Sequence, residues 1–185
     1  MDERLPIQGH LEGIVGAMFS GKTEELLRRI RRVKIAKIPI QMFKPKIDTR
    51  DGDFIVARNA GKVPCVQVEY AKDLLYLVRE ETKVVALDEV QFFDPQIVGV
   101  ADTLANRGLR IIWSGLDLDF RGQPFGSVPN LLAISEYITK LSAICTYPGC
   151  GAAAFRSARL SEGSGLVEVG HDYEARCRLH HKPVK

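Results

Sequence analysis

The chain has 185 residues, a formal net charge of +3 at pH 7 and 45% hydrophobic residues, which suits one ordinary globular domain with a small appendage. This charge is far from that of a protein that mainly binds nucleic acid, and no long block of one charge occurs. No apolar run approaches the roughly 18 residues of a membrane span, and residues 1–10 lack the apolar core of a signal peptide. We therefore expect a cytoplasmic protein that binds neither membranes nor nucleic acid.

The first chemical motif lies near the start of the chain. Residues 16–23 read GAMFSGKT and fit the pattern G-x-x-x-x-G-K-[ST], between an apolar run at 11–15 and apolar residues at helical spacing over 23–36. Such a loop binds phosphate because its glycines let successive backbone N–H groups face one anion, while the following helix adds its positive end. Lys22 would reach the β- and γ-phosphates, and Thr23 would bind Mg²⁺. The predicted phosphate-binding residues are Gly16, Ala17, Met18, Phe19, Ser20, Gly21, Lys22 and Thr23.

The rest of the chain alternates short β-prone runs with helical patterns. Residues 45–61 are polar and show no sustained period, which predicts a long loop. Alternating strands and helices, with continuous apolar strands, indicate an α/β fold of the P-loop (RecA-like) type, in which a mostly parallel sheet is flanked by helices. The sequence predicts strands at 38–44, 63–68, 83–87 and 109–114, and helices at 73–79 and 95–107.

Acidic residues follow two of the predicted strands. Asp88 and Glu89 come directly after an apolar run, as in a Walker B element, where one acid holds Mg²⁺ through water and a second orients or deprotonates a nucleophile. Because ligands bind at the carboxyl ends of parallel strands, we expect Asp88 on the metal side and Glu89 as general base. Asp48 and Arg50 could add a further Mg²⁺ contact and a phosphate contact, although a solvated pair of loop residues explains them equally well.

Three of the four cysteines lie near the end of the chain. Cys145 and Cys150 form a C-x₄-C pair, and Cys177 and His180 form a C-x₂-H pair. In a reducing compartment this clustering favours metal over disulfides. Four such ligands suit tetrahedral Zn²⁺ in a structural site with no position left for catalysis. His181 could replace His180, but we favour His180 because the two-residue separation closes a tighter turn.

The predicted zinc site also divides the chain. Residues 151–176, between the two ligand pairs, are too few to form a hydrophobic core of their own, so the metal would fold them. We expect residues 1–143 to form the P-loop domain and residues 144–185 to form a small zinc-binding subdomain.

Taken together, these motifs resemble the type II thymidine kinases, the family found in bacteria and in the animal cytosol. The resemblance covers nearly the whole chain and depends on the order and spacing of GAMFSGKT at 16–23, KPKIDTR at 44–50, DEVQFF at 88–93, GLDLDFRGQPFG at 115–126, CTYPGC at 145–150 and YEARCRLH at 173–180. It implies Mg²⁺-dependent transfer of the γ-phosphoryl group of ATP to the 5′-hydroxyl of thymidine, giving dTMP in nucleotide salvage, and deoxyuridine could also be accepted.

The resemblance further implies roles for single residues. Glu89 looks like the base that accepts the 5′-hydroxyl proton, helped by phosphate contacts from Lys22 and Arg50, while Thr23, Asp48 and Asp88 surround Mg²⁺. A segment at 166–173 would close over the base and read its edge through the backbone. The family also implies a homotetramer and feedback inhibition by dTTP. The residues implied to bind thymidine are Phe92, Leu116, Phe120, Ser157, Val167, Val169 and Tyr173.

Two other classes of function fit parts of the sequence. An Asp-Glu pair after an apolar strand also occurs in nucleic-acid-dependent ATPases, although a second motor domain and a strongly basic surface are missing. A nucleotide-binding module without turnover would use the phosphate loop and the zinc site but would not need Glu89. Turnover that depends on both thymidine and Glu89 separates a kinase from these alternatives.

Overall fold

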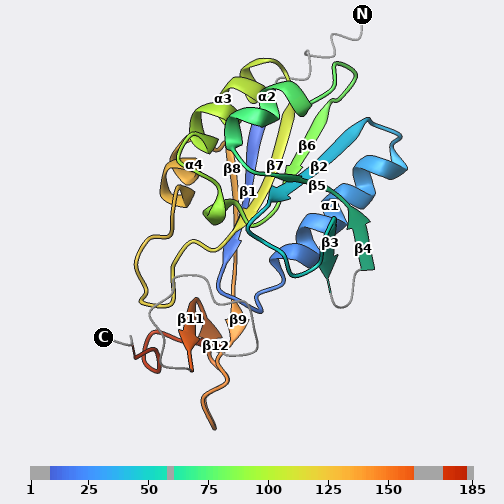
Figure 1. The fold of residues 1–185 in the computed structure, drawn as a ribbon. Helices are drawn as coiled ribbons and strands as arrows, with labels where there is room; N and C mark the ends of the chain where they lie inside the picture. The colour runs from blue at the N-terminus through green and yellow to red at the C-terminus, as the bar shows by residue number, and fades with distance from the viewer. Residues whose placement is uncertain (1–8, 58–60, 161–172, 183–185) are drawn as a thin grey trace, which may run out of the picture.

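A computed structural model describes residues 9–57, 61–160 and 173–182 (Figure 1). Its main sheet has six strands in the order β5-β2-β6-β7-β1-β8, and every neighbouring pair is parallel. The predicted α/β fold is therefore confirmed. The strands are β1 (His10–Gly16), β2 (Ile40–Pro45), β5 (Val66–Val68), β6 (Val84–Leu87), β7 (Arg110–Gly115) and β8 (Tyr137–Leu141).

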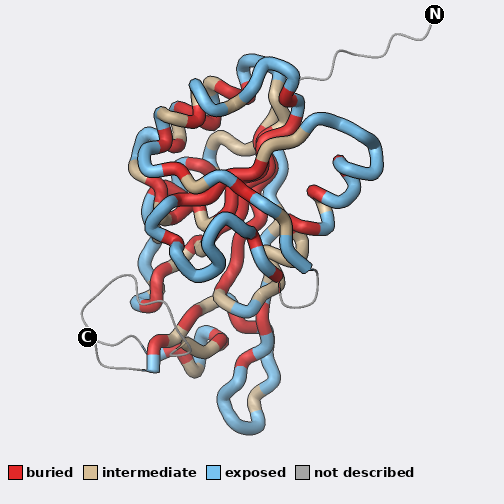
Figure 2. Tube along the Cα trace, turned by 45° about the vertical axis from the view of Figure 1, so that its right-hand side comes forward, coloured by how far each residue is buried: buried red, intermediate tan, exposed pale blue. Residues whose placement is uncertain are grey.

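Helices cover both faces of this sheet, which is why most side chains of its inner strands β1, β2, β6 and β7 are buried. On one face lie α1 (Lys22–Ile35) and a hairpin of β3 (Phe54–Ala57) and β4 (Gly61–Pro64). Figure 2 shows the buried stretches concentrated in the strands at the middle of the molecule. The other face carries the 3₁₀ turn η1 (Ala71–Asp73), α2 (Leu74–Leu77), α3 (Ile97–Asn106) and α4 (Val128–Ile134).

Alternating side chains of the strands contribute to two hydrophobic cores, one on each face of the sheet. Ile112 of β7 packs in the core beneath α1, whereas its neighbours Ile111 and Trp113 pack in the core beneath α3. The indole Nε1 of the fully buried Trp113 donates a hydrogen bond to Ser135 Oγ at 2.9 Å, so its polar atom is satisfied. None of the helices in the described ranges is long and apolar enough to cross a membrane.

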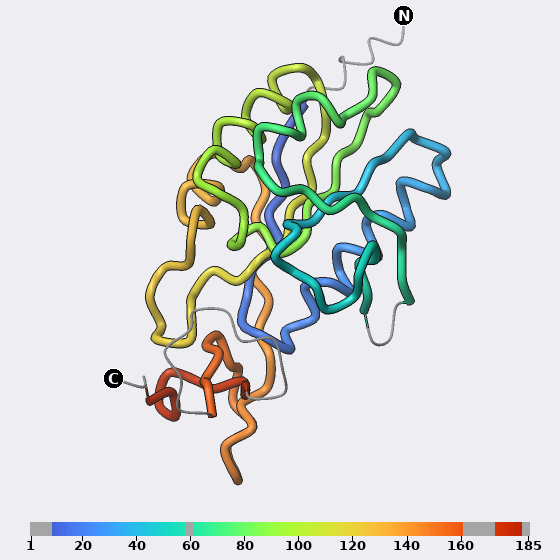
Figure 3. Tube along the Cα trace, viewed as in Figure 1, coloured from blue at the N-terminus to red at the C-terminus, as the bar shows by residue number. Residues whose placement is uncertain are grey.

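A small C-terminal unit follows β8 and lies beyond the carboxyl edge of the main sheet (Figure 3). Its short strands form two antiparallel pairs, and its buried core consists of alanines and cysteines. Such a core offers little apolar surface, and a metal ion bound to its cysteines would add to its stability. The strands are β9 (Ala143–Ile144), β10 (Ala153–Ala154), β11 (Arg156–Arg159) and β12 (Tyr173–Arg176).

Two predictions about the segment 45–68 were wrong. The expected loop over 45–61 contains β3, in which Ile55 and Ala57 are buried beneath α1 while Phe54 and Val56 are exposed. The expected single strand over 63–68 is two strands, since β4 pairs with β3 and β5 joins the main sheet. Four alternating residues are too few to register as a period in the sequence.

Candidate active site

The phosphate loop, residues 16–23, connects the end of β1 to the start of α1. Gly16 has no room for a side chain, because a Cβ there would lie 2.4 Å from the carbonyl oxygen of Leu141. Gly21 adopts the left-handed conformation with φ 85° just before the helix begins. The N-terminal amides of α1 thus face the loop, where they can bind an anion.

Lys22 folds back onto this loop, and its Nζ donates a hydrogen bond to the carbonyl oxygen of Ala17 at 2.9 Å. Burial lowers the pKa of Lys22 by desolvating its charged form, while Glu89 and Asp88 act in the opposite direction. The predicted phosphate-binding lysine is therefore close enough to the two acids after β6 to sense their charge.

A small pocket of about 60 Å³ lies at the carboxyl edge of the sheet, beside the start of α1. It is about large enough for two water molecules. The pocket brings together the residues that were predicted to act on Mg²⁺ and on the nucleophile. Its lining consists of Thr23, Lys44, Asp48, Arg50, Asp51, Phe54, Ile55, Val56, Asp88 and Glu89.

Arg50 joins two of these acids. Its Nε donates a hydrogen bond to Asp48 Oδ1 at 2.7 Å, and its Nη2 donates to Glu89 Oε1 at 2.5 Å. Burial favours a higher pKa for Asp48, but the charges and hydrogen bonds of Arg50, with a smaller effect of Lys44, bring it below the ordinary value. In this state of the chain, the predicted base is thus paired with a cation.

Asp88 is buried between β6 and β7. It accepts hydrogen bonds from the Ser114 hydroxyl and from the backbone N–H of Glu89. Burial, followed by the negative charge of Glu89, raises its pKa from the ordinary 3.8 to about 7. A strongly raised pKa in a polar pocket is typical of functional sites.

Gln91 is a functional candidate that the sequence did not reveal. Its buried Nε2 donates a hydrogen bond to Glu89, and its Oε1 accepts one from the backbone N–H of Leu116 at 3.0 Å. Glu89 itself has φ 53°, a left-handed conformation that is uncommon for this residue type. The position of Gln91, as a polar residue between the apolar Val90 and Phe92, is the only signal in the sequence for this role.

The residues predicted to bind thymidine are only partly described. Phe92 packs edge-on against Phe125, with 5.6 Å between ring centroids. Phe120 is only 6% exposed, and the guanidinium groups of Arg121 and Arg159 lie over its ring, so a base can stack on it only after a side chain moves. Tyr173 begins β12 and is half-buried, whereas Val167 and Val169 lie outside the described residues.

Ser157 contacts the phosphate loop. Its Oγ accepts a hydrogen bond from the backbone N–H of Met18 at 2.9 Å, although 139 positions separate the two residues. The C-terminal unit is therefore attached directly to the loop. The predicted contact of Ser157 with a base remains a prediction.

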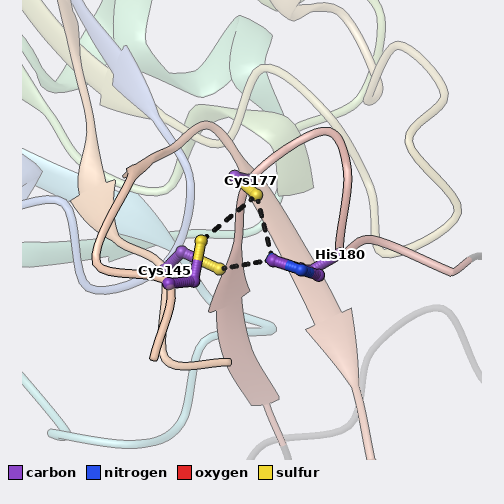
Figure 4. Close-up of side chains that lie close together, drawn as sticks. Cys145, Cys177 and His180 are labelled. Carbon is purple, nitrogen blue, oxygen red and sulfur yellow. Dashed lines mark hydrogen bonds between the residues drawn. The ribbon is translucent and has the colours of Figure 1, made fainter. Parts of the chain in front are cut away.

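The predicted zinc ligands converge on one point. All four ligand atoms, from Cys145, Cys150, Cys177 and His180, lie within 4.8 Å of one another. Tetrahedral zinc with Zn–S bonds of about 2.3 Å places sulfur atoms about 3.8 Å apart, and Cys150 Sγ lies 3.8 Å from Cys177 Sγ. His180 Nδ1 lies 3.3 Å from Cys177 Sγ and 3.7 Å from Cys145 Sγ (Figure 4). The cluster can hold a metal ion and fits structural zinc.

Local contacts prepare this cluster for metal. Desolvation works to raise the pKa of the Cys145 thiol, but hydrogen bonds from the backbone of Cys177 and Tyr147 lower it to about 6, which favours the thiolate. The ring of Tyr147 stacks on the His180 imidazole at 3.9 Å. His181 points elsewhere, since its Nε2 donates a hydrogen bond to the Phe120 carbonyl oxygen at 2.9 Å. Of the two histidines, the structure places His180 in the cluster, as predicted.

Comparison with protein families agrees with this arrangement. A sequence model of the family described as thymidine kinase matches residues 9–181. The chain belongs to the thymidine kinase family. Membership implies a kinase, that is, a phosphotransferase, and the matched range includes both the phosphate loop and the cysteine and histidine cluster.

The raised pKa of Asp88 predicts how this family member responds to pH. Because the pKa of Asp88 is about 7 when folded and 3.8 ordinarily, the contribution of Asp88 to folding stability falls as the pH rises through this window. Asp88→Asn keeps an acceptor for Ser114 and removes the buried charge. We expect it to raise the Tm at pH 8 by at least about 2 °C, the shift that ~1 kcal/mol gives in a chain of this size, and to raise it less at pH 5.

Thermal melts without divalent cations or nucleotides, at pH 5 and pH 8, measure this difference. The exposed Asp102→Asn on α3 is the control, for which we expect no dependence on pH. An Asp88→Asn variant that is less stable than the native chain at pH 8 would contradict the assignment of a buried, destabilising carboxyl group.

The cluster geometry predicts one bound zinc per chain and its loss from Cys177→Ser, because the remaining ligands no longer complete a tetrahedral site. Elemental analysis after gel filtration measures the metal content. Cys65→Ser is the matched control, since Cys65 is also buried but lies outside the cluster. Unchanged zinc in Cys177→Ser would rule out the proposed ligand set.

Proposed function

We propose that the chain transfers the γ-phosphoryl group of ATP to the 5′-hydroxyl of thymidine, giving dTMP and ADP, and that deoxyuridine is a second acceptor. The observation that carries this proposal is the pocket at the carboxyl edge of the sheet, where Glu89 and Arg50 lie beside the start of α1. Family membership supports it, since the match runs through every residue of the pocket.

The donor would bind along the phosphate loop, with Lys22 released from Ala17 to the β- and γ-phosphates. The oxygens of Thr23, Asp48 and Asp88 line the same pocket and are the ligands that Mg²⁺ prefers, so these residues would hold the ion directly or through water. Bound there, Mg²⁺ supplies positive charge that stabilises the transferring phosphoryl group.

Glu89 would act as general base. As the 5′-oxygen attacks the γ-phosphorus, its proton passes to the Glu89 carboxylate while the bond to the bridging oxygen of ADP breaks. For this step Arg50 must leave Glu89, and the phosphates of the donor offer it a new anionic partner. Gln91 keeps the freed carboxylate oriented through its amide.

The acceptor would lie between the phosphate loop and the C-terminal unit. Residues 144–185 would form a zinc-folded subdomain attached to the P-loop domain, residues 1–143, and Ser157 already reaches from it to Met18. We further propose a cytoplasmic homotetramer that dTTP inhibits by occupying the acceptor site with its phosphates in the loop. The residues proposed to bind the nucleoside are Phe92, Leu116, Phe120, Ser157, Val167, Val169 and Tyr173.

The proposed reaction predicts ADP release that requires thymidine and Mg²⁺ together. A coupled ADP assay with a panel of thymidine, deoxyuridine, deoxycytidine and deoxyguanosine measures acceptor choice, and thymidine should give the highest kcat/KM. Single-stranded DNA or RNA in place of the nucleoside tests the alternative of a nucleic-acid-dependent ATPase. Hydrolysis stimulated by nucleic acid but not by thymidine would refute the proposed function.

Glu89→Gln preserves the shape of the side chain but cannot accept the proton. We expect kcat to fall by about 10²–10⁴-fold, with the Kd of a non-hydrolysable ATP analogue, measured by isothermal titration calorimetry, changed by less than about threefold. The exposed Glu81→Gln in the turn before β6 is the control and should retain full turnover. Near-native turnover by Glu89→Gln would remove Glu89 from the role of base.

A further inference from the structure

Lys44 is a buried cation at the site to which the sequence assigns no role. It lies near the end of β2, is only 1% exposed and is one of the largest fully buried side chains. Its Nζ has no hydrogen-bond partner among the residues that the structure describes. Burying an ammonium group without hydrogen bonds is destabilising, so a functional reason for this lysine is expected.

Lys44 faces the acids of the pocket. Its Nζ lies 3.6 Å from Asp48 Oδ2, at salt-bridge distance, and it lines the same cavity as Asp88 and Glu89. Asp48 therefore has two cationic partners, with Arg50 on Oδ1 and Lys44 on Oδ2. Burial holds Lys44 in place, whereas 36% of the Arg50 side chain is exposed.

The two cations differ in what they can do when a nucleotide binds. Arg50 is shared between Asp48 and Glu89, and a phosphate group competes for the same guanidinium. When Arg50 leaves, Asp48 loses its closest cation while it remains beside Asp88 and Glu89. A second cation that cannot leave keeps a positive charge beside the Asp48 carboxylate and holds that side chain in place.

We propose that Lys44 is a positioning residue: it is the fixed counterion of Asp48 that allows Arg50 to move from the carboxylates to the phosphates of a bound nucleoside triphosphate. The inference depends on the proposed function for the identity of the nucleotide. Without Lys44, Arg50 remains the only basic side chain paired with Asp48 among the residues that the structure describes, and nucleotide binding has to break that pair without a replacement side chain.

A double-mutant cycle tests this coupling, with Lys44→Met, Asp48→Asn and the double variant. The first readout is the Kd of a non-hydrolysable ATP analogue with Mg²⁺, which does not require turnover. We expect Lys44→Met to weaken binding about tenfold in the native background but by less than about twofold in the Asp48→Asn background, because a neutral residue 48 needs no counterion. Lys46→Met is the matched control, since Lys46 is exposed and pairs with Glu69.

The second readout separates positioning from a purely structural role. Lys44→Met should lower kcat at least about tenfold while the KM of thymidine stays within about twofold, again only when Asp48 is present. Circular dichroism melts verify folding. If Lys44→Met does not fold, Lys44→Gln, which lacks the charge but can donate a hydrogen bond to Asp48, takes its place in the cycle.

Equal effects of the Lys44 variant in both backgrounds, or no effect on nucleotide binding, would overturn the inference. These outcomes are distinct from failure of the proposed function. A chain without thymidine-dependent turnover refutes the kinase proposal, whereas the binding cycle still decides whether Lys44 acts through Asp48.

Discussion

All six strands of the main sheet run in the same direction, and this parallel arrangement brings the residues of the candidate site together. Because β1, β2, β6 and β7 end at one edge, the residues that follow them meet there, although they come from distant parts of the sequence. The phosphate loop follows β1, Asp48 follows β2, and Asp88 and Glu89 follow β6. An antiparallel sheet would send successive strand ends to opposite edges.

The parallel sheet places three carboxylates close together at this edge, and two basic side chains of the same pocket offset their charge. Asp48, Asp88 and Glu89 line one pocket, and burial, followed by the negative charge of Glu89, raises the pKa of Asp88. Arg50 and Lys44 offset the charge, and Arg50 does so by pairing with the base that catalysis would need free. Phosphates entering at α1 would compete for Arg50, so donor binding and activation of Glu89 are linked in this account. A site that is unfavourable without its ligand is a common price of function.

Local patterns predicted the strands β1, β2, β6 and β7, the phosphate loop and the two pairs of zinc ligands, because each is encoded within a few neighbouring residues, whereas β8 was not predicted. The roles of Lys44 and Gln91 could not be predicted in this way. A lysine in a strand ordinarily suggests a solvent-facing position, and only the packing of β3 and the loop around the end of β2 shows that Lys44 is buried. The Ser157 contact with Met18 depends on the path of the whole chain. Strand β3 was not predicted, because its four residues are too few to show an alternating pattern and its two buried side chains are covered by packing beneath α1.

In the proposed reaction, Arg50 exchanges Glu89 for the phosphates of the donor, which frees Glu89 to accept a proton. A crystal structure with a non-hydrolysable ATP analogue, Mg²⁺ and thymidine measures this directly. We expect the Arg50 guanidinium on a phosphate oxygen, the 5′-oxygen within about 3 Å of the Glu89 carboxylate, and Lys44 still beside Asp48. A complex in which Arg50 still bridges Asp48 and Glu89, with the 5′-hydroxyl remote from Glu89, would contradict it.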